Sequence, residues 1–367
     1  MQLNDLKTLY KLPLPELLNR ANNVREKYFG TKISYSRNYI IPISNYCRNN
    51  CGYCAFRPRD HLIPAKIYSP AEIQDALKVA SNLKCWEVLF LSGEQGSVFE
   101  EVKSFLLQAG WSNLEEYYLW AMQQVVARGL LPHSNFGIIA RSWLEKFKPW
   151  NASMGLMLES ISVALCEPMM PHEFSPGKNP SRRLEFIRWA GELQIPFTTG
   201  LLIGVGESEL SRLESLLVIK DIALQYGHIQ EVILQNFVPN SSTPFGNHSP
   251  PSREEVLRLV AVARILFQGS LSIQVPPNLN PTGILDFIHA GANDLGGISP
   301  ISIDYVNPRE KWPDIEALSR CLSSQGYVLV PRLPVYDAFI SDKFLSPAIL
   351  SNIALIRKKV WNEFSNS

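Results

Sequence analysis

Three of the six cysteines, Cys47, Cys51 and Cys54, lie within one segment of eight residues. Cysteine thiolates are the usual ligands of iron–sulfur clusters. A cuboidal [4Fe–4S] cluster has four irons, so three cysteines leave one iron open to a ligand from outside the protein. The amino and carboxylate groups of S-adenosylmethionine (SAM) can fill that position. The spacing therefore predicts a single [4Fe–4S] cluster with three cysteine ligands, and SAM bound beside it.

Two other metal sites use cysteines, and both need a fourth protein ligand. A structural zinc ion takes four, and the nearest further candidate is His61, which six residues separate from Cys54. A ferredoxin cluster needs a fourth cysteine, but Cys85, Cys166 and Cys321 stand alone in the sequence. A zinc-stabilised binding module is thus the alternative that is not an enzyme.

The elements that must position these cysteines alternate along the chain. Short aliphatic or β-branched runs are each followed by a longer segment of helical period, which predicts a parallel sheet. We expect an α/β fold with a (β/α)8 or nearly closed partial barrel, and an open doubly wound sheet is the alternative. The expected strands are Tyr39–Ile43, Glu87–Leu91, Asn135–Ile139, Ser153–Leu158, Thr198–Ile203, Glu231–Gln235, Ser272–Val275 and Ala292–Leu295.

The expected helices carry start and stop signals. Capping boxes at Ser69, Ser112 and Ser252 predict three helix starts. A helix ahead of the first strand is expected to end at Gly30. We expect three parts: an N-terminal helical extension (1–32), the barrel (33–335) and a helical tail packed on the barrel (336–367).

Polar and glycine-rich motifs follow most of the expected strands. The cysteines follow the first strand, Ser92-Gly93-Glu94 the second, Glu159 the fourth and Gly204-Val205-Gly206-Glu207 the fifth. Pro276-Pro277-Asn278 follows the seventh. In a parallel barrel these strand ends share one face, where active sites lie. The motifs are therefore expected to converge on one cavity, which favours an enzyme.

The overall composition narrows the class of partner. Lys and Arg number 35 against 34 Asp and Glu, so no charge excess indicates nucleic acid or an anionic membrane. No apolar run is long enough to span a bilayer, and the N-terminus lacks a signal-peptide pattern. We expect a cytoplasmic protein that acts on a small molecule.

The cysteine segment resembles the radical SAM superfamily, whose pattern is C-x3-C-x-aromatic-C; the aromatic residue here is Tyr53. The resemblance implies that Tyr53 lies against the adenine of SAM. It also implies that Ser92, Gly93 and Glu94 bind the methionine amino group, and that the turn with Gly204, Gly206 and Glu207 supports adenine and ribose. Glu159 is either a ribose or amino contact or a carboxylate capped by solvent. The catalytic residues are not identified.

A narrower resemblance is to the small subunit of FO synthases, which form 7,8-didemethyl-8-hydroxy-5-deazariboflavin (FO), the precursor of coenzyme F420. It covers about residues 33–335, in the segments Tyr35–Asn38, Ile41–Ile43, Cys47–Arg57, Phe90–Gln95, Ser153–Ser160, Pro196–Gly200, Tyr226–Ile233, Pro276–Leu279 and Asn293–Pro300.

This resemblance implies a particular reaction. A separate radical SAM subunit joins tyrosine to a ribityl-diaminouracil. This chain, supplied by an electron donor, then abstracts hydrogen from the adduct, closes the ring and releases ammonia, as a carbon–nitrogen lyase. The alternative is a radical SAM enzyme of the biotin synthase or aminofutalosine pathway type that acts on another heterocycle.

Two segments depart from the family pattern. Cys166–His172 replaces a more glycine-rich stretch, and Pro244-Phe245-Gly246 replaces a different turn. Both are expected on loops at the substrate side. We therefore expect them to leave the cluster untouched but to put the fine substrate contacts in doubt.

Overall fold

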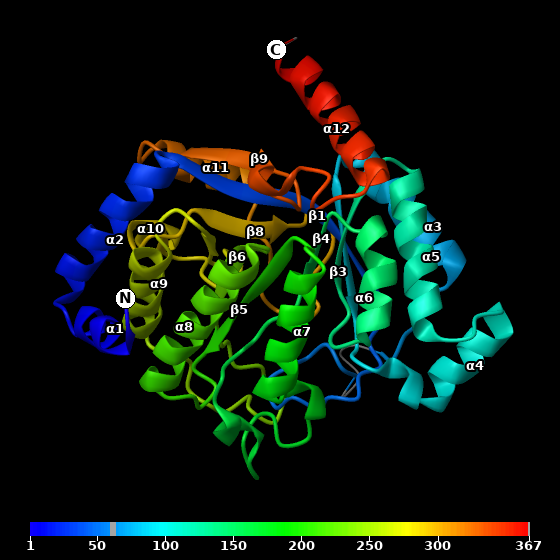
Figure 1. Ribbon diagram of the computed structural model, residues 1–367, viewed down its shortest axis with the longest axis horizontal. Helices are drawn as coiled ribbons and strands as arrows, with labels where there is room; N and C mark the ends of the chain where they lie inside the picture. Colours follow the sequence, from blue (N-terminus) through cyan, green and yellow to red (C-terminus); the bar gives the residue numbers. More distant parts are fainter. Residues whose placement is uncertain (59–63, 366–367) are drawn as a thin grey trace.

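The computed structural model describes residues 1–58 and 64–365, with side chains described as far as residue 359. Eight parallel strands form a closed barrel ringed by helices (Figure 1), because β1 pairs with both β2 and β8. The predicted barrel is confirmed, and the open sheet is excluded. The strands are β1 (Lys32–Ser44), β2 (Glu87–Ser92), β3 (Leu131–Asn135), β4 (Ser153–Gly155), β5 (Phe197–Ile203), β6 (Ile229–Asn236), β7 (Ser272–Gln274) and β8 (Asp294–Ile298).

Helices pack their apolar faces against the outside of the barrel. The helices are α1 (Leu3–Tyr10), α2 (Leu14–Phe29), α3 (Pro70–Asn82), α4 (Glu100–Ala109), α5 (Leu114–Ala127), α6 (Arg141–Phe147), α7 (Pro180–Glu192), α8 (Glu209–Tyr226), α9 (Arg253–Phe267), α10 (Ile284–His289), α11 (Ile315–Ser323) and α12 (Pro347–Ser365). Short 3-10 turns lie at Gly96–Val98, Lys148–Trp150, Val163–Cys166, Pro176–Lys178 and Asp337–Phe339. In the described part of the chain, no helix is long and apolar enough to cross a bilayer.

Most of the predicted helix signals are confirmed. Ser69 and Ser252 form capping boxes at the starts of α3 and α9, and Gly30 ends α2 in the left-handed region, at φ 59°. The capping box predicted at Ser112 is wrong, because the cap lies one residue later. Asn113 caps α5 instead, because its side-chain oxygen accepts a hydrogen bond from the backbone N–H of Glu116 (2.9 Å).

The third strand lies earlier than predicted, at Leu131–Asn135 rather than Asn135–Ile139. Pro132 does not break it, since its carbonyl still accepts a hydrogen bond from the N–H of Ala152 (3.0 Å). The apolar residues after Asn135 are buried, but Gly137 at φ 75° turns the chain into a loop. The residues of this loop are apolar because they are buried, and in the sequence such a run looks like a strand.

A ninth strand, β9 (Val328–Arg332), was not predicted. It pairs in parallel with the first residues of β1, Lys32–Ser36, beside the barrel's amino end. The chain then crosses this end of the barrel. There the Pro334 carbonyl accepts hydrogen bonds from Ser153 Oγ (2.7 Å) and Gln230 Nε2 (3.0 Å).

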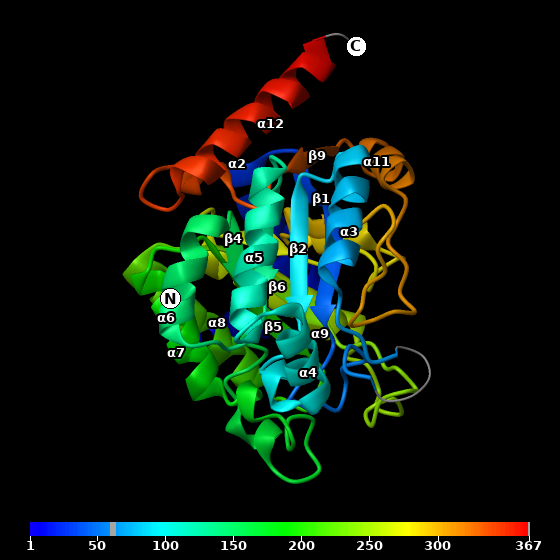
Figure 2. The same cartoon turned by 90° about the vertical axis from the view of Figure 1, so that its right-hand side faces the viewer.

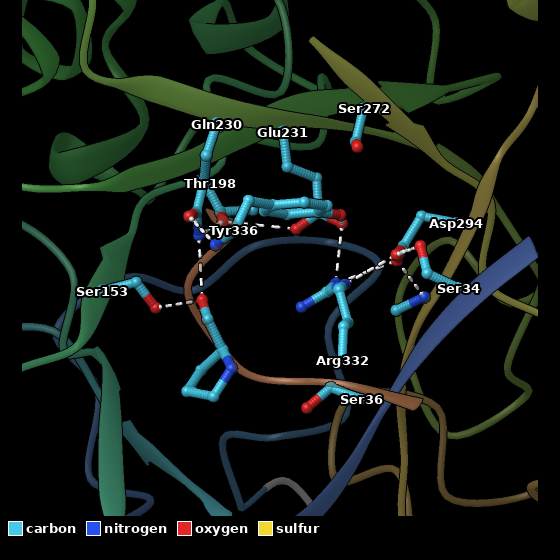
Figure 3. Close-up of polar contacts among 12 residues, drawn as sticks. Ser34, Ser36, Ser153, Thr198, Gln230, Glu231, Ser272, Asp294, Arg332 and Tyr336 are labelled. Carbon is cyan, nitrogen blue, oxygen red and sulfur yellow. Dashed lines mark hydrogen bonds and ion pairs between the residues drawn. The ribbon is translucent and has the colours of Figure 1, made fainter. Parts of the chain in front are cut away.

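Arg332 is the centre of a buried polar network at this amino end (Figure 3). Its guanidinium pairs with Glu231 (2.9 Å) and Asp294 (2.6 Å), and the Tyr336 hydroxyl donates to Glu231 (2.9 Å). Burial raises the pKa of Glu231 to about 8, whereas Arg332 holds the pKa of Asp294 below its usual value against the effect of burial. The network ties the segment after β9 to the inside of the barrel.

The last helix, α12, begins on the barrel and then extends away from it (Figures 1 and 2). Ile349, Ile353 and Ile356 pack with Val126 and Leu131, below the part that projects. The division into residues 1–32, 33–335 and 336–367 stays a prediction.

Candidate active site

A cavity of about 280 Å³, here called the active-site cavity, lies at the carboxyl ends of the strands. The arrows of β1 and β2 point towards this end, away from α12 (Figure 2). Eight of the predicted site residues line it, namely Cys47, Cys51, Tyr53, Cys54, Ser92, Gly93, Glu94 and Glu159. Gly204, Gly206 and Glu207 are not among the lining residues.

The cysteine loop packs directly on the loop that follows β2. The Gly93 N–H donates to the Ser44 carbonyl (2.7 Å), and the Arg48 N–H donates to the Glu94 carbonyl (2.9 Å). A Cβ atom on Gly93 would lie 2.1 Å from the Tyr46 carbonyl oxygen. Glycine is therefore needed at position 93 so that the two backbones can approach.

We expect Gly93→Ala to lower the iron and sulfide content of the reconstituted protein and its stability by about 1–3 kcal/mol, since an added methyl group has no space. Metal analysis and thermal unfolding measure the two effects. Gly110→Ala is the control: nothing lies within 4 Å of its added Cβ, but its φ of 80° strains alanine by about 1 kcal/mol. Equal iron content in Gly93→Ala and wild type would contradict this account.

Two further loops clamp the cysteine loop. The Gly52 N–H donates to the Pro171 carbonyl (2.7 Å), and the Phe245 N–H donates to the Gly52 carbonyl (3.0 Å). The Tyr53 hydroxyl and His172 Nε2 are hydrogen-bonded at 3.1 Å. Burial, together with nearby cations, lowers the pKa of His172 to about 2, so this imidazole is neutral.

These contacts come from the two segments that depart from the family pattern. Both Cys166–His172 and Pro244–Gly246 contact the cysteine loop, and their neutrality towards the cluster stays a prediction. The loops at one end of a barrel converge, and buried backbone N–H and carbonyl groups must find partners there. Both segments therefore help to hold the backbone around Gly52 and Tyr53.

Charged side chains surround the cavity wall opposite the cysteines. Glu94 is buried and accepts a hydrogen bond from the Ile138 N–H (3.1 Å), and Arg183 lies 4.0 Å from its carboxylate. Lys178 pairs with Glu159, whose backbone is in the left-handed region at φ 66°. Lys178 and Arg183 were not predicted. The only signal was a group of basic residues just before α7 and in its first turn, which is typical of a solvated helix start.

Arg183 has an unfilled hydrogen-bonding position. It is 3% exposed, and its Nη1 donates to the Met157 carbonyl (2.5 Å), but its Nε has no partner in the described residues. A buried donor without a partner is unfavourable. Because Arg183 lines the cavity, this donor suits an anionic group of a bound molecule.

The turn after β5 is held by its own glutamate. Glu207 accepts hydrogen bonds from the N–H groups of Gly204 (2.7 Å) and Val205 (2.8 Å), and it pairs with Arg212 (2.6 Å). Gly206 adopts φ 113° in this turn. Val205 packs in an apolar cluster with Cys51 and Tyr53. The turn thus packs against the cysteine loop through Val205. Direct contact of Gly204, Gly206 or Glu207 with SAM stays a prediction.

The cysteine set suits a cluster of several metal atoms. Burial raises the pKa of Cys47 to about 11 and that of Cys54 to about 12, so bound metal must displace protons there. No three His, Cys, Asp or Glu of the described residues converge to hold one metal ion. In a cuboidal cluster each thiolate binds a different iron, so convergence on one point is not required. His61, the fourth ligand of the zinc alternative, lies outside the described residues.

Solved structures share this fold. A methylornithine synthase superposes with a TM-score of 0.70 at 23% identity, over 90% of this chain and 94% of that one. The FeFe-hydrogenase maturase HydG from Carboxydothermus hydrogenoformans gives 0.73 at 17% identity, over 99% and 82%. Residues 41–218 match the family model of the radical SAM superfamily. Fold, cysteine loop and this match define a radical SAM protein.

Curated relatives give the particular family. The 7,8-didemethyl-8-hydroxy-5-deazariboflavin synthase of Methanothermobacter thermautotrophicus is 47% identical over 88% of this chain and 97% of its own length. The synthase of the same name from Archaeoglobus fulgidus is 44% identical over 86% and 94%. The chain belongs to the 7,8-didemethyl-8-hydroxy-5-deazariboflavin synthase family. A family of radical SAM proteins implies a [4Fe–4S] cluster and SAM, and this one implies a small-molecule substrate.

Proposed function

We propose that this chain forms the deazaflavin ring of FO from a tyrosine–ribityldiaminouracil adduct. Hydrogen is abstracted from the adduct, the ring closes and ammonia leaves, so the enzyme is a carbon–nitrogen lyase. This ring formation also removes two electrons from the adduct, and SAM, cleaved to methionine and 5′-deoxyadenosine, would be the oxidant that accepts them. The observation that carries the proposal is the meeting, in one cavity, of three cysteines, the Gly93-Glu94 backbone and an unpartnered Arg183 donor. The names of its relatives support the product.

We assign the cavity residues as follows. Cys47, Cys51 and Cys54 hold one [4Fe–4S] cluster, which with SAM supplies hydrogen-atom abstraction when bound. In this assignment Glu94 accepts a hydrogen bond from the amino group of SAM, and Arg183 donates one to its carboxylate. Apolar residues complete the wall and exclude water from the reacting atoms; they are Leu91, Leu156, Leu202 and Val306.

The proposed reaction also needs a partner subunit and an electron donor. The C-x3-C-x2-C motif occurs once, so one chain holds one such centre. We propose that a second radical SAM subunit makes the adduct and that an external electron donor reduces the cluster. A cytoplasmic location, where thiols stay reduced, is part of this proposal.

An anaerobic assay tests the proposal. The reconstituted protein is given the adduct, SAM and a reductant, and deazaflavin absorbance and 5′-deoxyadenosine are followed. We expect both products. Deoxyadenosine without deazaflavin would point to a radical SAM reaction on another heterocycle, and near-stoichiometric zinc without sulfide would refute the cluster.

A further inference from the structure

We propose that a second cavity inside the barrel binds the diaminouracil ring of the substrate. This inference rests on the proposed function. The cavity has a volume of about 170 Å³ and is here called the amide cavity, after Asn38, Gln235, Gln274, Asn278 and Asn307 in its lining. Its wall is shared with the active-site cavity at Leu91, Ile233, Gln235 and Val306. One molecule can therefore extend from one cavity into the other.

Three polar atoms at the amide cavity have no hydrogen-bond partner within the part of the chain that is described. They are Asn38 Oδ1, Asn278 Oδ1 and Trp312 Nε1. Asn38 is 1% exposed and Asn278 is 2% exposed, so water does not satisfy their oxygens from outside. Buried polar atoms are nearly always paired in folded proteins. Three exceptions lining one cavity point to a ligand that completes them.

The two amide oxygens are fixed as acceptors by their neighbours. Asn278 Nδ2 donates to Asp304 Oδ2 (2.9 Å), and a carboxylate only accepts, so the amide cannot turn its oxygen towards Asp304. Asp304 is itself anchored by the N–H groups of Val306 (2.9 Å) and Asn307 (3.0 Å). Burial raises the pKa of the Glu87 carboxyl, and the neighbouring Asn38 side chain counteracts this rise, as an amide nitrogen that donates to the carboxyl does. The acceptors are thus held in place before any ligand binds.

This arrangement matches a flat heterocycle rather than a sugar chain. Two acceptors and one donor complement ring N–H or amino groups next to a carbonyl, which is the edge that a diaminouracil offers. Apolar side chains of Ile40, Leu89, Leu279 and Leu295 form much of the remaining wall. A ribityl chain carries hydroxyl groups along its whole length, so some of them would lie against these apolar side chains, whereas a flat ring packs its faces on them. The tyrosine-derived half then lies at the shared wall, facing the active-site cavity.

Asn278→Leu tests the assignment, because it removes the fixed acceptor at nearly constant size. We expect the KM for the adduct to rise at least about tenfold, the usual consequence of one lost buried hydrogen bond. Binding of ribityl-diaminouracil alone to the cluster-loaded enzyme with SAM, measured by anaerobic calorimetry, should weaken by the same factor. The KM for SAM and SAM cleavage without substrate should stay at wild-type values, because these report on the active-site cavity and on correct folding.

The matched control is Asn280→Leu, in the same loop. Asn280 donates to Asn236 (2.9 Å) and to the Pro276 carbonyl (3.0 Å) but does not line the amide cavity, so it reports on loop damage alone. Trp312→Phe is a second variant, which removes the Nε1 donor together with part of the ring and should raise the same KM.

Four outcomes would contradict the assignment. Asn278→Leu within twofold of wild type, or equal losses in Asn280→Leu, would overturn the assignment. Ribitol that competes with the adduct as well as ribityl-diaminouracil does would also overturn it, in favour of the sugar chain. A wild-type enzyme that cleaves SAM but neither binds nor converts the adduct would contradict the proposed function and this inference together.

Discussion

The Cys51→Ala variant is expected to lose its iron–sulfur cluster and with it SAM cleavage, by more than about 100-fold. Removing a residue that only supports a metal ligand lowers metal affinity or activity by up to about 100-fold. Removing a ligand itself should lower activity by more than that. Cys51 is 5% exposed and lies between loops that hold its neighbours Gly52 and Tyr53, so the loop should keep its path without the thiol.

Iron, sulfide and 5′-deoxyadenosine per chain measure this effect after anaerobic reconstitution. Cys321→Ala is the control, because this exposed cysteine on α11 does not line the active-site cavity. It should behave as wild type in all three measurements. Full SAM cleavage by Cys51→Ala would show that the ligands are misassigned.

The second large effect is expected far from the cysteines, in Arg332→Met. This change leaves Glu231 and Asp294 buried at the barrel's amino end without their cation, which should cost about 3–5 kcal/mol of unfolding free energy. Arg357→Met is the control, since its partner Asp337 is exposed and such pairs contribute about 0–1 kcal/mol. Chemical denaturation at fixed pH compares the two variants with wild type.

The pH dependence of the Arg332→Met deficit identifies its cause. In wild type, Arg332 lowers the pKa of Asp294, so this carboxylate contributes stability above its unfolded pKa and loses it only as pH falls. Without Arg332, burial raises the pKa of Asp294 instead, and the stability that the protonated Asp294 contributes is then lost as pH rises. The deficit should therefore grow between pH 5 and pH 8, by up to about 1.4 kcal/mol per pH unit for the extra proton. A deficit that is constant or smaller at pH 8 would exclude this explanation.

Much of the fold and site could be predicted because the signals are local. Strand and helix periods repeat within about ten to twenty residues. The spacing of the three cysteines is enough by itself to indicate an iron–sulfur site. Placing Ser92, Gly93, Glu94 and Glu159 near them needed only the rule that parallel strand ends share a face. These residues do line one cavity.

The features that escaped prediction depend on distant partners. Val328–Arg332 is a short run with no distinctive pattern, and it becomes a strand only because Lys32–Ser36 lies beside it. Arg183 reads as a surface cation until the loops after β2 and β4 bury it against Glu94. The Asn278 oxygen is identified as an unpaired acceptor only because its amide nitrogen donates to Asp304 in the folded chain. Such pairings are tertiary, so no window of sequence contains them.

The pairing of β9 with the start of β1 has a consequence for how the protein is made. Lys32 leaves the ribosome long before Val328, yet the two residues are neighbours in the sheet. Contacts so distant in sequence form slowly, because a long loop must close first. Until then Glu231 and Asp294 lack Arg332, and the barrel's amino end stays open. We therefore expect the barrel's amino end to close only after synthesis passes residue 336.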